Sequence, residues 1–246
     1  MEISFSGKRA LVTGAGSGIG KGIARKLVEC GASVIALDVS QTSLDTLKSE
    51  LPAIETVTVN LCDWRSTKDV VRSICPVDLL VMVNNAGVGI TGPLEEVTEE
   101  KFDKIFNVNV KAVVNVTQTV IEDLLRRNSP GSIVNISSQA SKAALSNHSL
   151  YCATKSAIDG FTRVIALDYG KKNIRINCVN PTVVMTDLGR QIWSDPAVKL
   201  PMLDKIPLKR FAEIDDVVDA VLFLLSDHAK MITGSCLPVD GGFLAC

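Results

Sequence analysis

Short runs of apolar residues alternate with longer segments of helical period along the whole chain. Seven of these runs are rich in valine and isoleucine and apolar at successive positions, which is typical of strands buried on both faces of a parallel sheet. The predicted strands are residues 8–13, 33–38, 55–60, 78–85, 131–137, 174–180 and 235–240. The predicted helices are residues 19–30, 41–50, 66–74, 99–127, 149–169 and 214–226.

This alternation predicts an α/β fold, in which a doubly wound, Rossmann-type parallel sheet of seven strands carries helices on both faces. Neither a linker nor a repeat nor a low-complexity block divides the sequence, so we expect residues 1–246 to form a single domain. Only residues 186–212 depart from the alternation. This segment has three prolines and Trp193, and it is long enough to be a small lid over a substrate.

Composition and charge narrow the range of partners. The formal net charge is −1, which gives no sign of a nucleic-acid surface or of a polybasic membrane contact. The longest apolar runs are far shorter than the roughly 20 residues of a membrane helix. The N-terminus lacks a signal-peptide pattern and runs directly into the first strand. We therefore expect a cytoplasmic protein with neither a membrane nor a nucleic-acid partner.

The cysteines give no sign of cross-linking. There are seven, at positions 30, 62, 75, 152, 178, 236 and 246, and they form no C-x-x-C pair. An odd number of scattered cysteines predicts reduced thiols rather than a disulfide framework, and their spacing does not indicate a metal site.

A glycine-rich turn, T-G-A-G-S-G-I-G at residues 13–20, joins the first predicted strand to the first helix. Glycines at such a turn let the backbone approach a pyrophosphate, which then lies at the positive end of the helix. Asp38 ends the second strand, where a carboxylate can accept hydrogen bonds from both hydroxyls of an adenosine ribose. Capping the following helix is the alternative role for Asp38, and its position favours the ribose.

A second group of polar residues lies further along the chain. Tyr151 and Lys155 are four residues apart and share one face of a predicted helix. A phenol ordinarily ionises near pH 10, and a neighbouring ammonium favours the phenolate, which brings proton exchange closer to neutral pH. Ser138 follows the strand at 131–137, at the edge where open α/β sheets bind ligands. An exposed helix face would explain the Tyr–Lys spacing but not the position of Ser138.

These motifs together identify a family resemblance. With glycines at 14, 18 and 20, N-N-A-G at 84–87 and Y-x-x-x-K at 151–155, the whole chain resembles the short-chain dehydrogenase/reductase family. The longer phrases NHSLYCATK, NPTVVMTDLG and TGSCLPVDGGFLAC are most similar to its L-xylulose/dicarbonyl reductase subgroup. The resemblance implies a homotetramer that reduces small ketoses and α-dicarbonyls with a nicotinamide cofactor, or oxidises a polyol such as xylitol. A dehydrogenase for an apolar secondary alcohol (steroid, terpenoid or fatty-acyl) and a non-catalytic nucleotide-binding scaffold are the alternatives.

The resemblance also implies which residues form the site, without any metal. Asn109, Ser138, Tyr151 and Lys155 are the expected catalytic residues. The sequence itself adds Gln139 and His148, which bring polar groups close to Ser138 and Tyr151, and Trp193 on the predicted lid. The expected substrate contacts are Ser138, Gln139, His148, Tyr151 and Trp193. The expected cofactor contacts are Gly14, Ser17, Gly18, Ile19, Gly20, Asp38, Asn85, Ala86, Gly87, Tyr151, Lys155, Pro181, Val184 and Thr186. The family's usual glycine after Pro181 is replaced by Thr182.

The choice between the two nicotinamide cofactors depends on the end of the second strand. The subgroup resemblance implies NADP(H), whose 2′-phosphate needs a basic residue beside it. This chain has Asp38 and Val39 at that point, and Ser17 rather than a cation in the glycine turn. Because a carboxylate repels a phosphate, the sequence predicts a preference for NAD(H).

Overall fold

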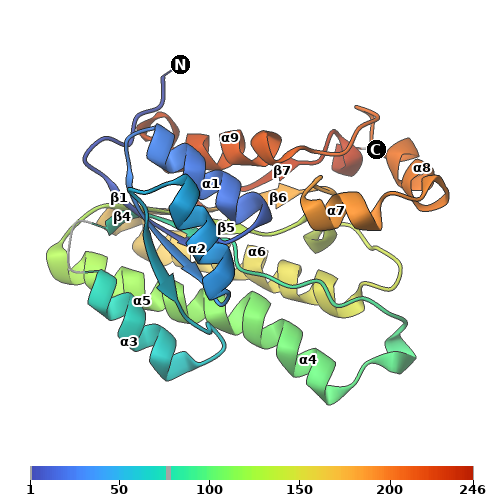
Figure 1. Ribbon diagram of the computed structural model, residues 1–246, viewed down its shortest axis with the longest axis horizontal. Helices are drawn as coiled ribbons and strands as arrows, with labels where there is room; N and C mark the ends of the chain where they lie inside the picture. Colours follow the sequence, from blue (N-terminus) through green and yellow to red (C-terminus); the bar gives the residue numbers. More distant parts are fainter. Residues whose placement is uncertain (1, 76–78, 246) are drawn as a thin grey trace.

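The computed structural model describes residues 2–75 and 79–245 (Figure 1). Its centre is a sheet of seven strands in the order β3-β2-β1-β4-β5-β6-β7, and all neighbouring strands are parallel. The strands are β1 (Arg9–Thr13), β2 (Ser33–Asp38), β3 (Glu55–Thr58), β4 (Leu79–Asn84), β5 (Gly131–Ile136), β6 (Ile174–Pro181) and β7 (Cys236–Val239). The predicted seven-stranded parallel sheet is confirmed. The first residue of the predicted strand 78–85, Asp78, lies outside the described residues.

The helices join the strands as the pattern predicts, with additional short helices near the C-terminus. They are α1 (Gly18–Glu29), α2 (Gln41–Glu50), α3 (Trp64–Ile74), α4 (Glu99–Phe106), α5 (Ala112–Arg127), α6 (Ser149–Tyr169), α7 (Asp187–Ile192), α8 (Pro196–Asp204) and α9 (Ile214–Leu225). Short 3₁₀ turns are η1 (Leu94–Glu96), η3 (Gln139–Ser141), η4 (Gly170–Lys172), η5 (Asp227–Ala229) and η6 (Phe243–Ala245).

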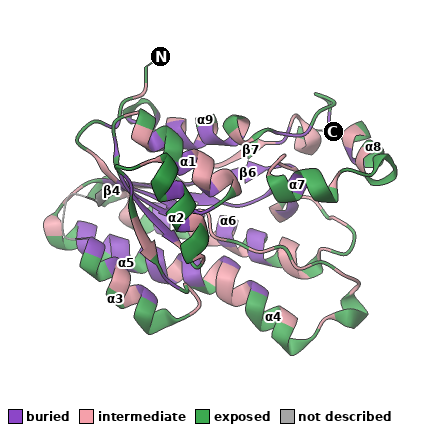
Figure 2. Cartoon of the chain, in the orientation of Figure 1, coloured by how far each residue is buried: buried purple, intermediate pink, exposed green. Residues whose placement is uncertain are grey.

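Each face of the sheet is covered by its own helices, because successive side chains of a strand point to opposite faces. Val12 of β1 packs in a cluster with Ile23 of α1 and Val221 of α9, and α2 contributes to the same cluster. The preceding side chain, Leu11, belongs to a second cluster with Val116 of α5, to which α3 and α6 also contribute. The buried strands between these two helical layers are visible in Figure 2.

The segment predicted as one helix over residues 99–127 is divided in the structure. A π-helical turn, η2 (Asn107–Lys111), separates α4 from α5. In this turn Asn109 is buried, and its amide hydrogen-bonds both the backbone N–H and the carbonyl of Val88, at 2.8 and 2.9 Å. The loop that follows β4 is therefore attached to the helix at the point where the helix widens.

The segment 186–212 folds into α7, α8 and a connection to α9. Trp193 is half-buried and packs edge-on against Phe211, with ring centroids 5.2 Å apart. Met202 and Ile206 complete this small cluster, which is separate from the two sheet cores. Across the described ranges 2–75 and 79–245, we find no helix that is long and apolar enough to span a membrane.

The strand order places a crevice at the carboxyl edge of the sheet. After β3 the chain crosses from one side of β1 to the other and enters the sheet again as β4, so the direction of winding reverses between β1 and β4. In doubly wound folds, ligands bind outside the strand ends at such a reversal. The loops that follow β1, β4, β5 and β6 all leave from this edge.

Candidate active site

The glycine turn after β1 leaves no room for side chains. A Cβ built on Gly20 would lie 2.1 Å from the carbonyl oxygen of Gly14, and one on Gly14, which has φ +62°, would lie 2.8 Å from the Cα of Ala86. Ser17 precedes α1 in an extended conformation, and its side chain makes no capping bond. The first turn of α1, with Gly18 and Ile19, therefore offers its backbone N–H groups to an anion.

Asp38 lies beside this turn, at the end of β2. Its Oδ2 accepts a hydrogen bond from the backbone N–H of Gly16 at 2.9 Å, and its Oδ1 accepts one from Ser40 at 3.0 Å. Val39 is 69% exposed and carries no charge toward the site. The N-cap of α2 is Ser40, whose hydroxyl accepts from the Ser43 N–H, so Asp38 does not cap this helix; it borders the glycine turn.

One lysine and one arginine on α1 could offset the charge of Asp38, but both form ion pairs with a different carboxylate. Lys21 and Arg25 both form ion pairs with Glu50 of α2, at 2.7 and 2.5 Å. These pairs hold α1 against α2 and leave the carboxylate as the charged group that borders the turn.

The segment after β4 is fastened to the glycine turn. The Asn85 side chain donates hydrogen bonds to the carbonyls of Thr13 and Gly14, at 3.2 and 3.0 Å. The Thr13 hydroxyl in turn accepts from the backbone N–H groups of Asn85 and Ala86. Gly87 follows. The N-N-A-G motif thus forms one wall of the crevice with the turn as the other.

Tyr151 and Lys155 lie on adjacent turns of α6, as their spacing predicts. The Lys155 ammonium is 5.7 Å from the centre of the Tyr151 ring, and the lysine side chain is only 6% exposed. The ammonium donates a hydrogen bond to the carbonyl of Ile136, the last residue of β5, at 2.8 Å. A Cβ on Gly87 would lie 3.7 Å from this ammonium and 3.4 Å from the Asn109 Oδ1, so Gly87, Asn109 and Lys155 converge.

Ser138 lies at the carboxyl end of β5, and its Oγ accepts a hydrogen bond from the Ala140 N–H at 3.1 Å. The next residue, Gln139, is 2% exposed, and its Oε1 is buried without a hydrogen-bond partner among the residues that the structure describes. His148 is half-buried and meets the Tyr151 ring edge-on, with centroids 6.3 Å apart. Its Nδ1 is 2.6 Å from the Ser146 carbonyl.

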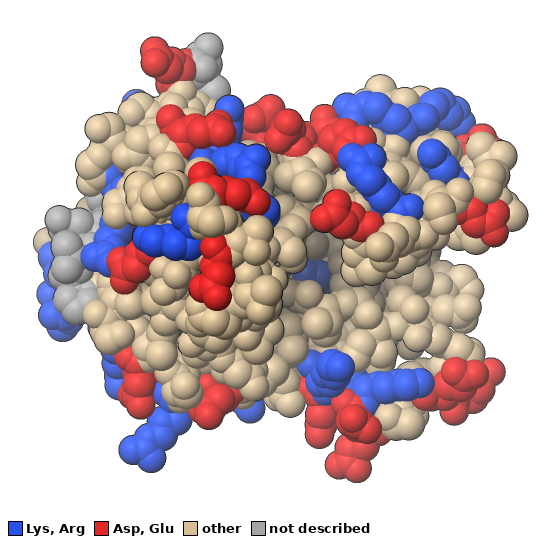
Figure 3. Space-filling model, viewed as in Figure 1, with Lys and Arg blue, Asp and Glu red and all other residues tan. Residues whose placement is uncertain are grey.

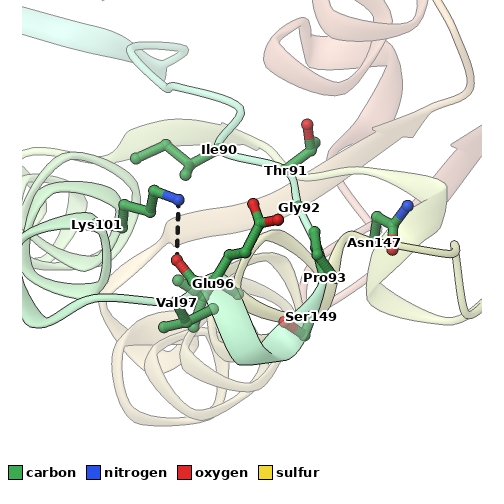
Figure 4. Close-up of a pocket in the computed structure, with 10 residues that line it drawn as sticks. Ile90, Thr91, Gly92, Pro93, Glu96, Val97, Lys101, Asn147 and Ser149 are labelled. Atoms are coloured by element: carbon green, nitrogen blue, oxygen red, sulfur yellow. Dashed lines mark hydrogen bonds between the residues drawn. The ribbon is translucent and has the colours of Figure 1, made fainter.

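A small pocket lies beside the start of α6, two residues before Tyr151 (Figure 4). The chain that follows β4 passes across it, and Gly92 donates a backbone hydrogen bond to the Asn147 carbonyl at 2.8 Å. On the other side, Lys101 donates to the carbonyl of Glu96 at 2.9 Å. The N-terminal end of α6 is thereby fixed against residues 90–97.

The chain leaving β6 borders the glycine turn from the opposite side. Val184 forms a bridge with Ala212, and Thr186 caps α7 through its hydroxyl, which accepts from the Gly189 N–H at 3.1 Å. A Cβ on Gly18 would lie 3.1 Å from the Thr186 Cγ2. Pro181 is the last residue of β6. Trp193, by contrast, packs on Phe211 within the cluster of segment 186–212.

Comparison with known proteins agrees with this geometry. A family model described as enoyl-(acyl carrier protein) reductase matches residues 14–244. The L-xylulose reductase of Mesocricetus auratus is 54% identical over 99% of both chains, and the D-erythrulose reductase of Gallus gallus is 50% identical over 99% of this chain and 98% of its own. A putative NAD(P)-dependent gluconate 5-dehydrogenase from Beutenbergia cavernae, with NADP at low occupancy, superposes with a TM-score of 0.93 at 31% identity and full coverage of both chains.

The chain belongs to the short-chain dehydrogenase/reductase family. As a short-chain dehydrogenase/reductase, it is an oxidoreductase that depends on a nicotinamide cofactor. The turn that a Cβ at Gly14 or Gly20 would fill, together with the free N–H groups of α1, fits the pyrophosphate of such a cofactor.

The sequence analysis missed a polar network behind Ser138 in this short-chain dehydrogenase/reductase. Asn180 of β6 donates to the Ser138 carbonyl at 3.1 Å, to the Ser141 hydroxyl at 2.9 Å and to the carboxylate of Asp159 at 3.1 Å. Ser141 donates to the same carboxylate at 2.7 Å. Thr13 was missed as well. The signal that could have found Asn180 is a polar side chain inside an otherwise apolar strand, which needs buried partners.

The surface around the crevice has no dominant charge. The face seen in Figure 3 is hollowed beside α7 and α8, and basic and acidic side chains are intermixed over it. Such a surface gives little electrostatic selection for a strongly charged substrate.

Proposed function

We propose that this oxidoreductase reduces the carbonyl group of small polyhydroxylated ketoses and α-dicarbonyls, of the L-xylulose type, and oxidises the corresponding polyol in reverse. The observation that carries the proposal is Gln139. It is next to Ser138, and its Oε1 is a buried acceptor without a partner among the described residues. A buried acceptor of this kind costs free energy unless a donor reaches it, and a substrate hydroxyl is such a donor. The relatives named L-xylulose and D-erythrulose reductase support the same class.

In the proposed mechanism the chain supplies orientation and a proton. Tyr151 donates its hydroxyl proton to the carbonyl oxygen, and the Ser138 hydroxyl hydrogen-bonds that oxygen as it becomes an alcohol. The Lys155 ammonium, held by the Ile136 carbonyl, stabilises the phenolate that remains. Asn109, fixed by Val88, supports the relay that restores the proton. When bound, the nicotinamide cofactor supplies the hydride.

We also propose roles for the remaining predicted site residues. Gly14, Ser17, Gly18, Ile19 and Gly20 hold the pyrophosphate. Asn85, Ala86 and Gly87 border the nucleotide, whereas Pro181, Val184 and Thr186 border the nicotinamide. His148 and Trp193 are the proposed substrate contacts beyond Gln139, and segment 186–212 is the proposed lid. Residues 1–246 act as one domain, because the crevice needs loops from β1 to β6.

We further propose that NAD(H) is preferred over NADP(H). Asp38 is oriented by two backbone N–H groups, and the neighbouring cations of α1 are paired with Glu50. The carboxylate is therefore free to accept hydrogen bonds from an unphosphorylated ribose and would repel a 2′-phosphate. NADP bound to a structural neighbour such as the Beutenbergia cavernae protein belongs to that protein.

A homotetramer is proposed from the exposed apolar side chains of α4 and α6. Phe102 is 44% exposed and stacks on Phe106, while Val164 and Leu167 are 57% and 82% exposed. Helix faces of this kind are usually covered in oligomers. Light scattering of Leu167→Glu should show smaller assemblies than wild type, whereas Leu188→Glu on α7 should not. A monomeric wild type would refute the tetramer.

We also propose a cytoplasmic location. The six described cysteines form no disulfide, and Cys246 lies outside the described residues.

The substrate class is tested by measuring cofactor oxidation with L-xylulose, diacetyl and an apolar ketone in parallel. We expect the first two to be turned over faster than the third. In Gln139→Leu, the kcat/KM for L-xylulose should fall by roughly 5- to 100-fold, because an unpaired hydroxyl costs about 1–3 kcal/mol. Diacetyl has no hydroxyl group and should be much less affected, so it serves as the internal control.

Two results would contradict the proposal. Faster turnover of the apolar ketone would favour a steroid, terpenoid or fatty-acyl alcohol dehydrogenase. Nucleotide binding without turnover of any carbonyl compound would favour a non-catalytic scaffold.

A further inference from the structure

Two cysteines that are far apart in the sequence are direct neighbours in the sheet. Cys178 of β6 pairs in register with Cys236 of β7, the last strand in the sheet order. Asp159 of α6 packs over the pair. The two Sγ atoms and a carboxylate oxygen of Asp159 all lie within 4.8 Å of one another.

The carboxylate in this cluster lacks a counter-charge. Asp159 is 3% exposed, and it forms no ion pair with any residue in the described ranges. Its only partners there are neutral donors, the Ser141 hydroxyl and the Asn180 amide. Burying a carboxylate without a cation is costly, and hydrogen bonds offset only part of that cost. A divalent cation bound there would pair directly with the Asp159 carboxylate, and its binding would release the protons of the two thiols to solvent.

The thiols are arranged to support a cation. Cys178 is fully buried, and its thiol donates a hydrogen bond to the Thr162 hydroxyl at 3.1 Å. Cys236 is half-buried, so the cluster has a route to solvent. The hydrogen bonds that Ser141 and Asn180 donate to the Asp159 carboxylate resemble the outer shell that orients ligands in metal sites.

We propose that Asp159, Cys178 and Cys236 bind one thiophilic divalent cation of the zinc class, with a water molecule as the fourth ligand. Two sulfur ligands and one carboxylate oxygen suit zinc, which forms bonds of about 2.3 Å to sulfur and about 2.0–2.2 Å to oxygen in a tetrahedral site. Such a site requires ligand atoms within about 4 Å of one another, so the cluster must contract by less than about 1 Å.

The simpler role for the two cysteines is packing, since buried thiols commonly behave as small apolar side chains. Cys178 does contact Val113 and Ile158 in a small apolar cluster. Packing does not explain why a buried carboxylate lies within 4.8 Å of both thiols. The bound cation would join α6, one turn beyond Lys155, to strands β6 and β7, and would thereby stabilise the helix that carries Tyr151.

The test uses the full chain, kept reduced and stripped of metal, and titrated with Cd²⁺ alone. Cadmium bound to thiolates gives an ultraviolet charge-transfer band. We expect this band to saturate at one Cd²⁺ per chain in wild type. Cys178→Ala and Cys236→Ser should weaken binding by more than about 100-fold, beyond the 10–100-fold effect of losing an outer-shell partner. Cys62→Ala removes one thiol in the loop after β3, at the opposite edge of the sheet from β7, and should bind as wild type does.

Asp159→Asn provides a variant that keeps the shape of the site. It should weaken Cd²⁺ binding while leaving the two-thiolate band, and its circular dichroism spectrum reports whether it is folded. As a second measurement, chelation should lower the Tm of wild type and of Cys62→Ala but not of Cys236→Ser. Equal Cd²⁺ binding by wild type and Cys236→Ser, or no band in wild type, would overturn the proposal and leave the cysteines a packing role.

Discussion

The charge at the end of β2 can be reversed by two substitutions, Asp38→Ser and Val39→Arg. The first removes the carboxylate, and the second places a guanidinium on an exposed side chain beside the adenosine ribose. We expect wild type to prefer NADH over NADPH by tens- to about hundred-fold in kcat/KM. The double variant should lose that preference and move toward NADPH.

The expected magnitude follows from the local charges. Two unit charges 4 Å apart repel by about 4 kcal/mol at an effective dielectric constant of 20 and by about 1 kcal/mol in water. The Asp38 site is half-buried, and a 2′-phosphate carries nearly two charges, so a screened repulsion of about 2–3 kcal/mol is reasonable. This energy corresponds to the stated ratio. Lys21 and Arg25 reduce it little, because both are paired with Glu50.

The assay is the initial rate of ketose reduction with each cofactor, at low and at high salt. Asp45→Ser is the matched control, since Asp45 is an exposed carboxylate of the neighbouring α2 and is bonded to Gln41 rather than to the glycine turn. It should leave the preference unchanged. If wild type already prefers NADPH, the carboxylate argument is wrong. If Asp45→Ser shifts the preference as much as Asp38→Ser, the effect is one of net charge and not of position.

Three further outcomes are expected. Tyr151→Phe should reduce turnover by about 10²–10⁴-fold with dinucleotide affinity nearly unchanged, whereas Lys155→Met should reduce both turnover and affinity. Cofactor fluorescence titration measures the affinity separately from turnover. Near-normal turnover in Tyr151→Phe would remove Tyr151 from the mechanism. Gly20→Ala should weaken dinucleotide binding by at least about fivefold, because the new Cβ would lie 2.1 Å from a backbone oxygen and overpacking costs about 1–3 kcal/mol, whereas Gly170→Ala, with open space around it, should not. A hydrogen bond from Arg210 lowers the pKa of Asp216, so this pair stabilises the fold above the carboxyl's ordinary range and stops doing so as the pH falls through the lowered value. Asp216→Asn should therefore lower the Tm by a few degrees at pH 7, and a difference that did not shrink as the pH was lowered below the carboxyl's ordinary range would contradict this assignment.

The local pattern of apolar residues was sufficient to predict the architecture of the sheet. Leu11 and Val12 are both apolar because each points into a different core, and this double burial is what a parallel strand requires. The π-helical turn at 107–111 was not predictable in the same way. It depends on the amide of Asn109 reaching the backbone of Val88, a contact that forms only after the sheet has brought the two segments together.

The candidate site also contains some residues whose placement the sequence predicts and others whose placement it does not. The spacing of Tyr151 and Lys155 determines their common face, and the position of Ser138 after β5 follows from the strand pattern. The roles of Asn180 and Asp159 depend on hydrogen bonds between β6, α6 and the turn after β5. Cys178 and Cys236 become neighbours only through the pairing of β6 with β7. Sequence spacing carries no information about such long-range pairs.

The turn η2 also changes the angular phase between two helices. An α-helix advances about 100° per residue, and a π-helical turn contains one residue more than an α-helical turn. Every position of α5 is thereby rotated relative to α4. Val116 and Val120 of α5 face the sheet while Phe102 of α4 remains on the outside. Because the turn holds one residue more than an α-helical turn, removing one residue from 107–111 would leave an α-helical turn and keep α5 facing the sheet, and the cost would fall on the contact of Asn109 with Val88.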